Sequence, residues 1–335
     1  MLGLPAAPNA KLKAQNLKLP CSPSMFFAFY VHHLSPFLIR FNEQFGIRWY
    51  GLAYIAGFIA AFYLMKWLAR KGYGPLRENQ VGDFVFYTAL FGVLLGGRLG
   101  YVFFYRPSML TEDPLGIFRV WDGGMASHGG ILGVVIFSWI YAWRHRIAWT
   151  GIGDNLVAVA PVGLFFGRMA NFINGELYGR PTTVPWAMQF PAELLDHPNE
   201  ATLAIQETMK IDPTLSNVPD VIAAARHSAQ VREILAGILT PRHPSQLYEA
   251  FLEGILLFTL LILIRLKFKK PDGVTTGCFF VLYPVMRITG ELFREPDAPL
   301  TGPFTRGQFL SLFMLLVGAL FLWNAWRKKA ANHSI

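Results

Sequence analysis

The sequence predicts an all-α polytopic membrane protein, with seven transmembrane helices and a small extracytoplasmic head. Of the 335 residues, 53% are hydrophobic and only 15% are charged, whereas soluble domains carry about 25% charged residues. The apolar residues fall into long runs, and a membrane-spanning helix needs about 20 mostly apolar residues. The basic residues gather in short clusters between these runs, where they signal membrane topology.

The composition also limits the kinds of partner and of catalytic chemistry that the protein can have. The formal net charge of +9 would suit a nucleic-acid-binding protein, but the placement of the basic clusters beside apolar runs favours the lipid bilayer as partner and excludes nucleic acid. Two cysteines, Cys21 and Cys278, make neither a disulfide framework nor a CxxC metal motif. The sequence contains no Gly-rich phosphate loop, HExxH or GxSxG motif. We therefore expect no metal and no cofactor, and chemistry that uses arginines and acid–base groups.

The first 48 residues differ from the rest. Residues 1–24 are polar and proline-rich and lack the apolar region of a signal peptide. Membrane-like sequence begins at Met25, which favours Met25 as the native start and 1–24 as an extension. Residues 25–48 are moderately apolar but interrupted by histidine, proline and arginine, and we expect an interfacial segment there.

Seven apolar runs between residues 49 and 326 are long enough, wholly or nearly, to form membrane-spanning helices. They cover residues 49–69, 81–105, 129–143, 152–174, 245–266, 274–293 and 308–326. The interval 175–241 is too long for a turn, and its early prolines argue against a long helix at its start. We expect it to form the head, and residues 327–335 to form a short cytoplasmic tail.

Basic residues set the predicted orientation. With seven spans, the four clusters within 66–77, 144–146, 265–270 and 327–329 lie on one side of the membrane. Excess lysine and arginine in short loops mark the cytoplasmic side. The C-terminus is therefore expected in the cytoplasm and the N-terminus outside, and the end of the fourth run then lies toward the outer leaflet.

The fourth run ends in an unusual polar stretch, Gly167–Gly179, which contains Arg168, Asn171, Asn174 and Glu176. Charged groups at the end of a membrane helix are costly, and they usually face the protein interior or a water-filled cavity. This stretch is therefore the leading candidate for a functional site.

The sixth run carries Tyr283, Arg287, Glu291 and Arg294, which fall on one face at helical spacing. The stripe indicates an anion site, because the planar guanidinium fork suits phosphate; an internal ion-pair network that fixes packing is the alternative. In the fifth run, Gln246, Glu249 and Glu253 also share one face. They can orient these arginines, although an acid near a helix start can instead act as a cap.

Three further residues have open interpretations. His128 lies between a flexible loop and a predicted span, with glycine pairs on both sides that allow close backbone approach. It is either a chemical or substrate-orienting group or a hydrogen-bonded structural histidine. Arg98 either adds charge to the cavity or extends to the interface. Tyr50 fits an aromatic interface belt and is also a candidate site residue.

Residues 167–179 resemble the signature Gly-Arg-x-Gly/Ala-Asn-Phe-x-Asn-x-Glu-x-x-Gly of the prolipoprotein diacylglyceryl transferase family. Further blocks are similar to that family and occur in its order, over about residues 45–326. They are Trp49–Gly51, Gly96–Arg98, Trp121–Met125 with His128–Gly130, Arg242–Glu249 and Phe293–Asp297. The extension at residues 1–24 and the composition of residues 180–241 depart from the family.

The resemblance implies a seven-span bacterial inner-membrane enzyme with its N-terminus outside and its active site toward the outer leaflet. Such an enzyme transfers the diacylglyceryl group of phosphatidylglycerol to the lipobox cysteine of a prolipoprotein signal peptide and releases glycerol phosphate. The implied essential or substrate-binding residues are Tyr50, His128, Arg168, Asn171, Glu176, Gly179, Tyr283, Arg287, Glu291 and Arg294.

A mechanism follows as an expectation. The substrate thiol must lose its proton to attack well, and negative charge then develops on the departing glycerol phosphate. Arg168 and Arg287 are expected to hold that charge, with Arg294 in support. We expect His128 to act as the base with help from Tyr283, and Glu291 to orient Arg287. The alternative is a transporter or binding protein for an anionic lipid without chemistry, although no internal repeat typical of many transporters is visible.

Overall fold

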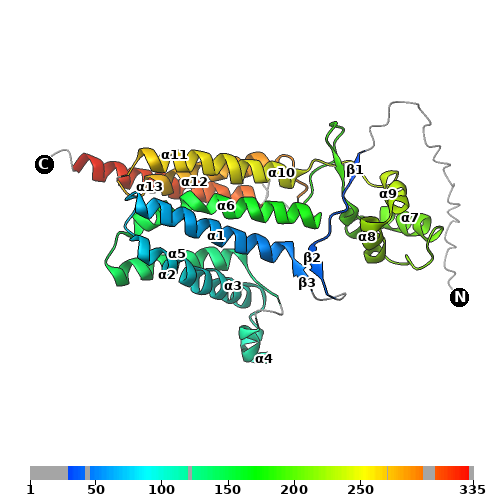
Figure 1. The fold of residues 1–335 in the computed structure, drawn as a ribbon, viewed down its shortest axis with the longest axis horizontal. Coiled ribbons are helices and arrows are strands. Elements are labelled where there is room, and N and C mark those ends of the chain that lie inside the picture. Colours follow the sequence, from blue (N-terminus) through cyan, green and yellow to red (C-terminus); the bar gives the residue numbers. More distant parts are fainter. Residues whose placement is uncertain (1–28, 42–45, 120–122, 270, 297–305, 332–335) are drawn as a thin grey trace, which may run out of the picture.

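The computed structural model describes residues 29–41, 46–119, 123–269, 271–296 and 306–331. The predicted extension at 1–24, the predicted start at Met25 and the motif residues Trp121, Asp122 and Asp297 lie outside these ranges. Most of the described chain is helical, and the long helices run side by side along the long axis of the molecule (Figure 1).

Seven helical bodies occupy the seven apolar runs in the described part of the chain. They are α1 (Trp49–Arg70), α2 to α3 (Val81–Tyr87 and Gly96–Tyr105, joined by the π-helical segment η2, Thr88–Leu95), α5 (Ser127–His145), α6 (Trp149–Asn174), α10 to α11 (Ser245–Glu249 and Leu257–Lys267, joined by the π-helical segment η6, Ala250–Leu256), α12 (Val274–Glu291) and α13 (Arg306–Ala331). A short helix, α4 (Met109–Glu112), follows α3.

Four of these bodies are long and apolar enough to cross a membrane, namely 49–70, 78–105, 149–174 and 245–267. The prediction of a mostly helical polytopic membrane protein is therefore confirmed. The remaining three bodies, α5, α12 and α13, are helices at the predicted places, and the count of seven spans stays a prediction.

Helix α6 has the central position, because it packs against α1, α5, α10, α11, α12 and η6. Its apolar residues form an uninterrupted helix despite Pro161, and it ends where Gly175 adopts the left-handed conformation with φ of 72°. Glycine tolerates this conformation at a helix C-terminus without steric cost. The helix end therefore places residues 168–174 against α10 and η6 on one side and leads into residues 175–179.

Helices α3 and α5 approach each other through glycines. A Cβ atom on Gly100 would lie 2.5 Å from the Cα atom of Gly129, and a Cβ atom on Gly129 would lie 2.5 Å from the carbonyl oxygen of Gly96. Small residues at such spacing allow membrane helices to pack backbone to backbone. This contact fixes the start of α5, where His128 lies.

The interval 175–241 forms a compact helical head at one end of the bundle (Figure 1). It contains α7 (Pro198–Met209), α8 (Val218–His227) and α9 (Ala229–Ala236). The side chains of Asn217 and Ser228 cap α8 and α9 by accepting backbone N–H bonds from Asp220 and Val231. A small buried core, which includes Leu194, Ala204, Val221 and Leu235, holds these helices together.

The segment before α1 is tied to this head. Strand β1 (Tyr30–Val31) pairs in parallel with β4 (Met188–Gln189), and Val31 is part of the head core. Strands β2 (Phe37–Arg40) and β3 (Gly46–Arg48) form a separate antiparallel pair directly before α1. The sequence predicts an interfacial segment at 25–48, but no pattern in it indicates that Tyr30 and Val31 pair with residues more than 150 positions away.

His32, which follows β1, is buried against the end of α6. Its ring stacks on Phe190 at a centroid distance of 5.5 Å and meets Phe172 edge to face at 5.5 Å. Burial lowers the pKa of His32 from 6.5 to about 4; nearby His33 and Arg226 act in the same direction, and a bond to the backbone of Phe172 only partly offsets them. The folded protein therefore holds this histidine neutral.

This burial predicts a pH-dependent stability. Between about pH 6.5 and pH 4 the unfolded chain binds a proton at His32 that the folded chain does not, so stability is lost as the pH falls through this window. The difference in pKa corresponds to about 3 kcal/mol. We expect His32→Gln to flatten the pH dependence of the thermal unfolding temperature between pH 7 and 4, while the matched control His33→Gln retains it. An unchanged slope in His32→Gln would contradict the assignment.

Candidate active site

A network of arginines and glutamates lies inside the bundle, between α6, α10, η6 and α12. Arg168 of α6 contacts Glu253 at 2.9 Å and Glu249 at 3.0 Å. Arg287 of α12 contacts the same two glutamates at 3.3 and 3.2 Å. Sequence periodicity placed Glu249 and Glu253 on one face, and the structure shows that this face meets both arginines.

The network continues along α12. Arg287 pairs with Glu291 one turn further at 2.6 Å, and Arg294 reaches Glu249 at 3.4 Å. Glu249 therefore contacts three arginines and is the last residue of α10, so it orients the arginines and does not cap the helix start. The predicted pairing of Glu291 with Arg287 is present.

The distribution of exposure within the network indicates how it can act. Glu249 and Glu253 are completely buried, whereas the side chains of Arg168 and Arg287 keep 14% and 15% of their exposure. Three arginines and three glutamates balance in formal charge, which meets the requirement that buried charges be paired. Because Arg168 and Arg287 are the most exposed members of the network, it can offer their guanidinium groups to an anion while the buried carboxylates of Glu249 and Glu253 hold them in place.

The polar motif at the end of α6, Gly167–Gly179, is held by its own side chains. Glu176 accepts bonds from Asn171 at 2.7 Å and from Asn174 at 3.3 Å. Gln246 donates to the carbonyl oxygen of Glu176 at 2.7 Å, and Ser245 donates to that of Leu177 at 2.9 Å. The two asparagines and the glutamate of the motif therefore fix the turn, and the start of α10 fixes it from outside.

Gly179 lies where three segments meet. Its N–H donates to the carbonyl oxygen of His243 at 2.9 Å, and it forms a β-bridge with Arg294. A Cβ atom here would lie 2.6 Å from the carbonyl oxygen of Phe293. The position requires glycine because backbone, which cannot yield, surrounds it. The close approach joins the end of the motif to the segment that carries Arg294.

The tyrosines are placed differently. Tyr283 lies one turn before Arg287 on α12, stacks on Phe279 at 5.4 Å and is within electrostatic range of Arg168, Arg287 and Glu253. Tyr50 is at the start of α1, partly buried, with its ring 5.6 Å from that of Tyr54. The structure thus brings Tyr283 to the network and leaves Tyr50 on a helix that packs against α6.

His128 is not brought into the network. It is the second residue of α5 and is exposed. Among the described residues it makes no hydrogen bond or ion pair with the arginines or glutamates of the network. Its helix packs mainly on α3 and η2, so a role for His128 requires substrate to lie between α5 and α6.

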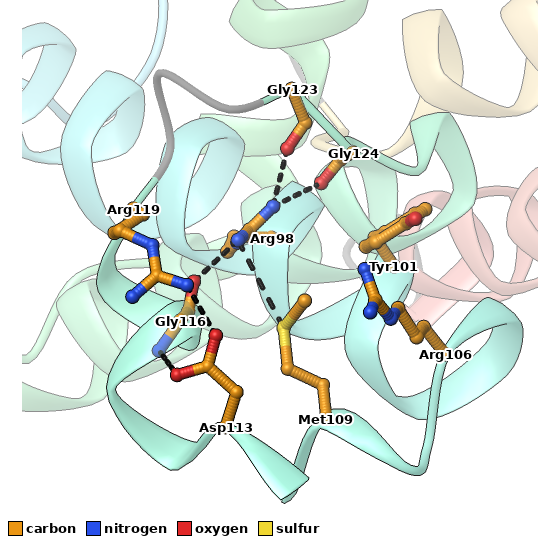
Figure 2. A pocket seen from close by; sticks show the side chains of 9 residues that line it. All are labelled: Arg98, Tyr101, Arg106, Met109, Asp113, Gly116, Arg119, Gly123 and Gly124. Atoms are coloured by element: carbon orange, nitrogen blue, oxygen red, sulfur yellow. Dashed lines mark hydrogen bonds and ion pairs between the residues drawn. The ribbon is translucent and has the colours of Figure 1, made fainter.

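Arg98 has a different role from both predicted ones, because it is 3% exposed and is bound to backbone carbonyls. Its guanidinium donates to the carbonyl oxygens of Gly116 at 2.5 Å, Ile117 at 2.9 Å and Gly124 at 3.1 Å, and also to that of Gly123. Arg98 lines a cavity of about 180 Å³. Figure 2 shows its guanidinium among the carbonyl groups of Gly116, Gly123 and Gly124, which also line this cavity. Arg98 therefore stabilises the loop between α3 and α5. It neither adds charge to the arginine–glutamate network nor extends to the interface.

Two residues close to the motif, His32 and Arg242, have no role that the sequence predicts. His32 comes from the N-terminal segment, and the side chain of Arg242 lies beside Gly179 and Tyr178. Only the presence of Arg242 in a family-like block signalled it. Within the described ranges, no group of three or more His, Cys, Asp or Glu side chains is arranged to hold a metal ion.

The fold and the network define a class: a helical membrane protein whose interior presents arginines held by buried glutamates. Comparison with known proteins is more specific. The family model for prolipoprotein diacylglyceryl transferase matches residues 36–324. The chain therefore belongs to the prolipoprotein diacylglyceryl transferase family and is a transferase, which confirms the family prediction.

Relatives named phosphatidylglycerol–prolipoprotein diacylglyceryl transferase match nearly the whole chain. One from Bdellovibrio bacteriovorus is 40% identical over 339 residues, covering 90% of this chain and 95% of the relative. One from Coxiella burnetii is 39% identical over 304 residues, covering 90% and 98%. One from Bradyrhizobium diazoefficiens is 42% identical over 297 residues, covering 85% and 90%.

The packing around Gly179 gives a testable prediction. We expect Gly179→Ala to lower transferase activity by at least about 10-fold, because the new methyl group displaces the motif from the segment of Arg294. The matched control is Gly163→Ala in α6, where a Cβ atom would meet no other atom within 4 Å. Activity measured per folded protein checks the prediction. Equal activity of the two variants would show that the close approach is dispensable.

Proposed function

We propose that the protein transfers the diacylglyceryl group of phosphatidylglycerol to the lipobox cysteine thiol of prolipoproteins, the first step of lipoprotein maturation. The single observation that carries the site assignment is the network in which Glu249 and Glu253 hold two partly exposed arginines. The names of the relatives supply the substrates, and the network supplies a place for the phosphate of the lipid headgroup.

In the proposed reaction, the cysteine thiolate attacks the C3 carbon of the glycerol that carries the acyl chains. A sulfur–carbon bond forms while the carbon–oxygen bond to phosphate breaks, and the thiol proton is taken up by a base. Glycerol phosphate leaves with the bonding electrons. Arg168 and Arg287 stabilise the developing negative charge, since preorganised donors of this kind need no rearrangement during the reaction.

The remaining residues have supporting roles in this proposal. Arg294 adds positive charge near Glu249, and Glu291 keeps Arg287 in place through the pair at 2.6 Å. Asn171, Glu176 and Gly179 shape the turn that borders the headgroup, and Tyr50 contributes to substrate binding from α1. His128 acts as the base from the start of α5, with Tyr283 beside the network. No cofactor is required, because the nucleophile belongs to the substrate.

We further propose a bacterial inner-membrane location with seven spans, the N-terminus outside and the C-terminus in the cytoplasm. The basic clusters at the ends of the helical bodies and in the loops that follow them support this orientation. The head at 175–241 then lies on the extracytoplasmic side, and the network opens toward the outer leaflet. Prolipoprotein signal peptides that present a lipobox cysteine would reach it there.

The reaction can be tested directly. Purified protein is incubated with phosphatidylglycerol labelled in the diacylglyceryl part and a peptide containing a lipobox cysteine. We expect a thioether-linked diacylglyceryl peptide, identified by mass spectrometry, with release of glycerol phosphate. A peptide with serine in place of cysteine serves as control. Movement of labelled lipid across vesicles without product would instead indicate a transporter.

The network predicts the effect of removing its cations. We expect Arg168→Ala and Arg287→Ala each to lower the transfer rate by at least about 100-fold, the loss expected when a charge-stabilising donor is removed. Arg144→Ala changes an exposed arginine at the end of α5 and should leave the rate unchanged. All variants are compared at equal amounts of folded protein. Near-normal transfer by either network variant would exclude that arginine from the mechanism.

A further inference from the structure

Arg242 joins the head to the candidate site, although nothing in the proposed reaction uses it. It lies between the head and α10, and it is 3% exposed. Its main chain pairs with β4 through two bonds to Met188, at 2.8 and 2.9 Å. Its side chain therefore starts from a fixed position and has little freedom to rearrange.

On the head side, the guanidinium is held by a buried acid. Its Nε atom donates to Glu193, which is 0% exposed. The other carboxylate oxygen of Glu193 accepts the N–H of Thr240 at 2.8 Å. A terminal nitrogen of Arg242 lies 3.0 Å from Nε2 of His197. Glu193 and His197 both belong to the head, close before and at the start of α7.

On the site side, the same guanidinium binds the end of the motif. It donates to the carbonyl oxygen of Gly179 at 3.2 Å and lies 4.8 Å from the ring centroid of Tyr178. It also donates to Glu295 at 3.2 Å, the residue after Arg294. One planar fork thus reaches the head, the motif and the segment that leaves α12.

We propose that Arg242, held by Glu193, is a positioning residue that sets the motif end at Tyr178 and Gly179 against the segment of Arg294. The head thereby takes part in transfer by fixing the geometry of the site. This rests on the proposed function, because it concerns the rate of that reaction. Lysine cannot replace the arginine, since an ammonium group lacks the planar fork that bonds in several directions.

Other hydrogen bonds also hold the end of the motif, so a positioning role of Arg242 can be distinguished from a role in folding. Ser245 and Gln246 hold Leu177 and Glu176, and the N–H of Gly179 donates to the carbonyl oxygen of His243, a backbone bond that does not involve the Arg242 side chain. Loss of the Arg242 side chain should therefore move the motif end without unfolding the bundle. Displacements of about 1 Å from a distant change can lower a rate about 100-fold.

The experiment compares Arg242→Gln, Arg242→Lys, Glu193→Gln and the double variant Glu193→Gln/Arg242→Gln. The matched control is Arg232→Gln, because the bond of the Arg232 side chain within the described residues stays inside the head, to the carbonyl oxygen of Ala225 at 2.9 Å. Full-length protein in phosphatidylglycerol vesicles is used throughout. The measurements are kcat, KM for the lipobox peptide and the thermal unfolding temperature.

We expect Arg242→Gln to lower kcat by about 30- to 100-fold, and Arg242→Lys and Glu193→Gln to lower it by about 10-fold. KM should stay within about 3-fold, and the double variant should match Arg242→Gln because both residues act through one tie. Arg232→Gln should retain wild-type kcat at a similar unfolding temperature.

Three outcomes would overturn the proposal. The first is a folded Arg242→Gln variant with the kcat of the wild type. The second is a double variant whose loss of kcat equals the product of the losses in Arg242→Gln and Glu193→Gln. The third is failure of all three single variants to give folded protein, which would make the tie purely structural. If only Arg242→Gln fails to fold, the kcat values of Arg242→Lys and Glu193→Gln test the proposal, and wild-type kcat in both would overturn it. If the wild-type protein itself shows no transfer, the proposed function is refuted. The wild-type measurement therefore separates a failure of the proposed function from a failure of the positioning role.

Discussion

The pairing of buried glutamates with arginines inside the bundle is the interaction on which the rest of the structure depends. Glu249 and Glu253 are fully buried, and an unpaired carboxylate there would be strongly destabilising. Arg168 from α6 and Arg287 from α12 supply the counter-charges. Three separate helices must therefore keep one alignment, and that alignment also leaves Arg168 and Arg287 partly exposed. The same charges thus stabilise the fold and, in the proposed reaction, hold the departing glycerol phosphate.

The backbone around this network is adapted to it. Glu253 lies in the π-helical segment η6, which shifts the facing of side chains relative to a regular helix and is frequent at functional sites. Gly254 in the same segment lets Phe165 of α6 approach closely. At the end of α6, Gly175 turns the chain so that the motif folds back toward α10. Local irregularity thus brings the polar groups together.

Several elements of the site were predictable because they depend on short-range periodicity. The spacing of Tyr283, Arg287 and Glu291 required one helical face, and the structure has it. The spacing of Glu249 and Glu253 likewise predicts that they share one face, and they do, even though η6 is not a regular helix. Arg98 could not be interpreted correctly, because its partners are carbonyl oxygens of a loop 18 to 26 residues further on. Backbone acceptors leave no pattern in a sequence.

The sequence by itself determined the helical membrane class, the places of the helical bodies and the family, since these follow from hydropathy and local motifs. Only the tertiary structure decided which helices share the buried charges, that His128 is separate from the network and that β1 and Arg242 connect the head to the motif. These contacts join residues far apart in the chain. They are set by packing, where each ion pair or bridge depends on the position of several elements at once.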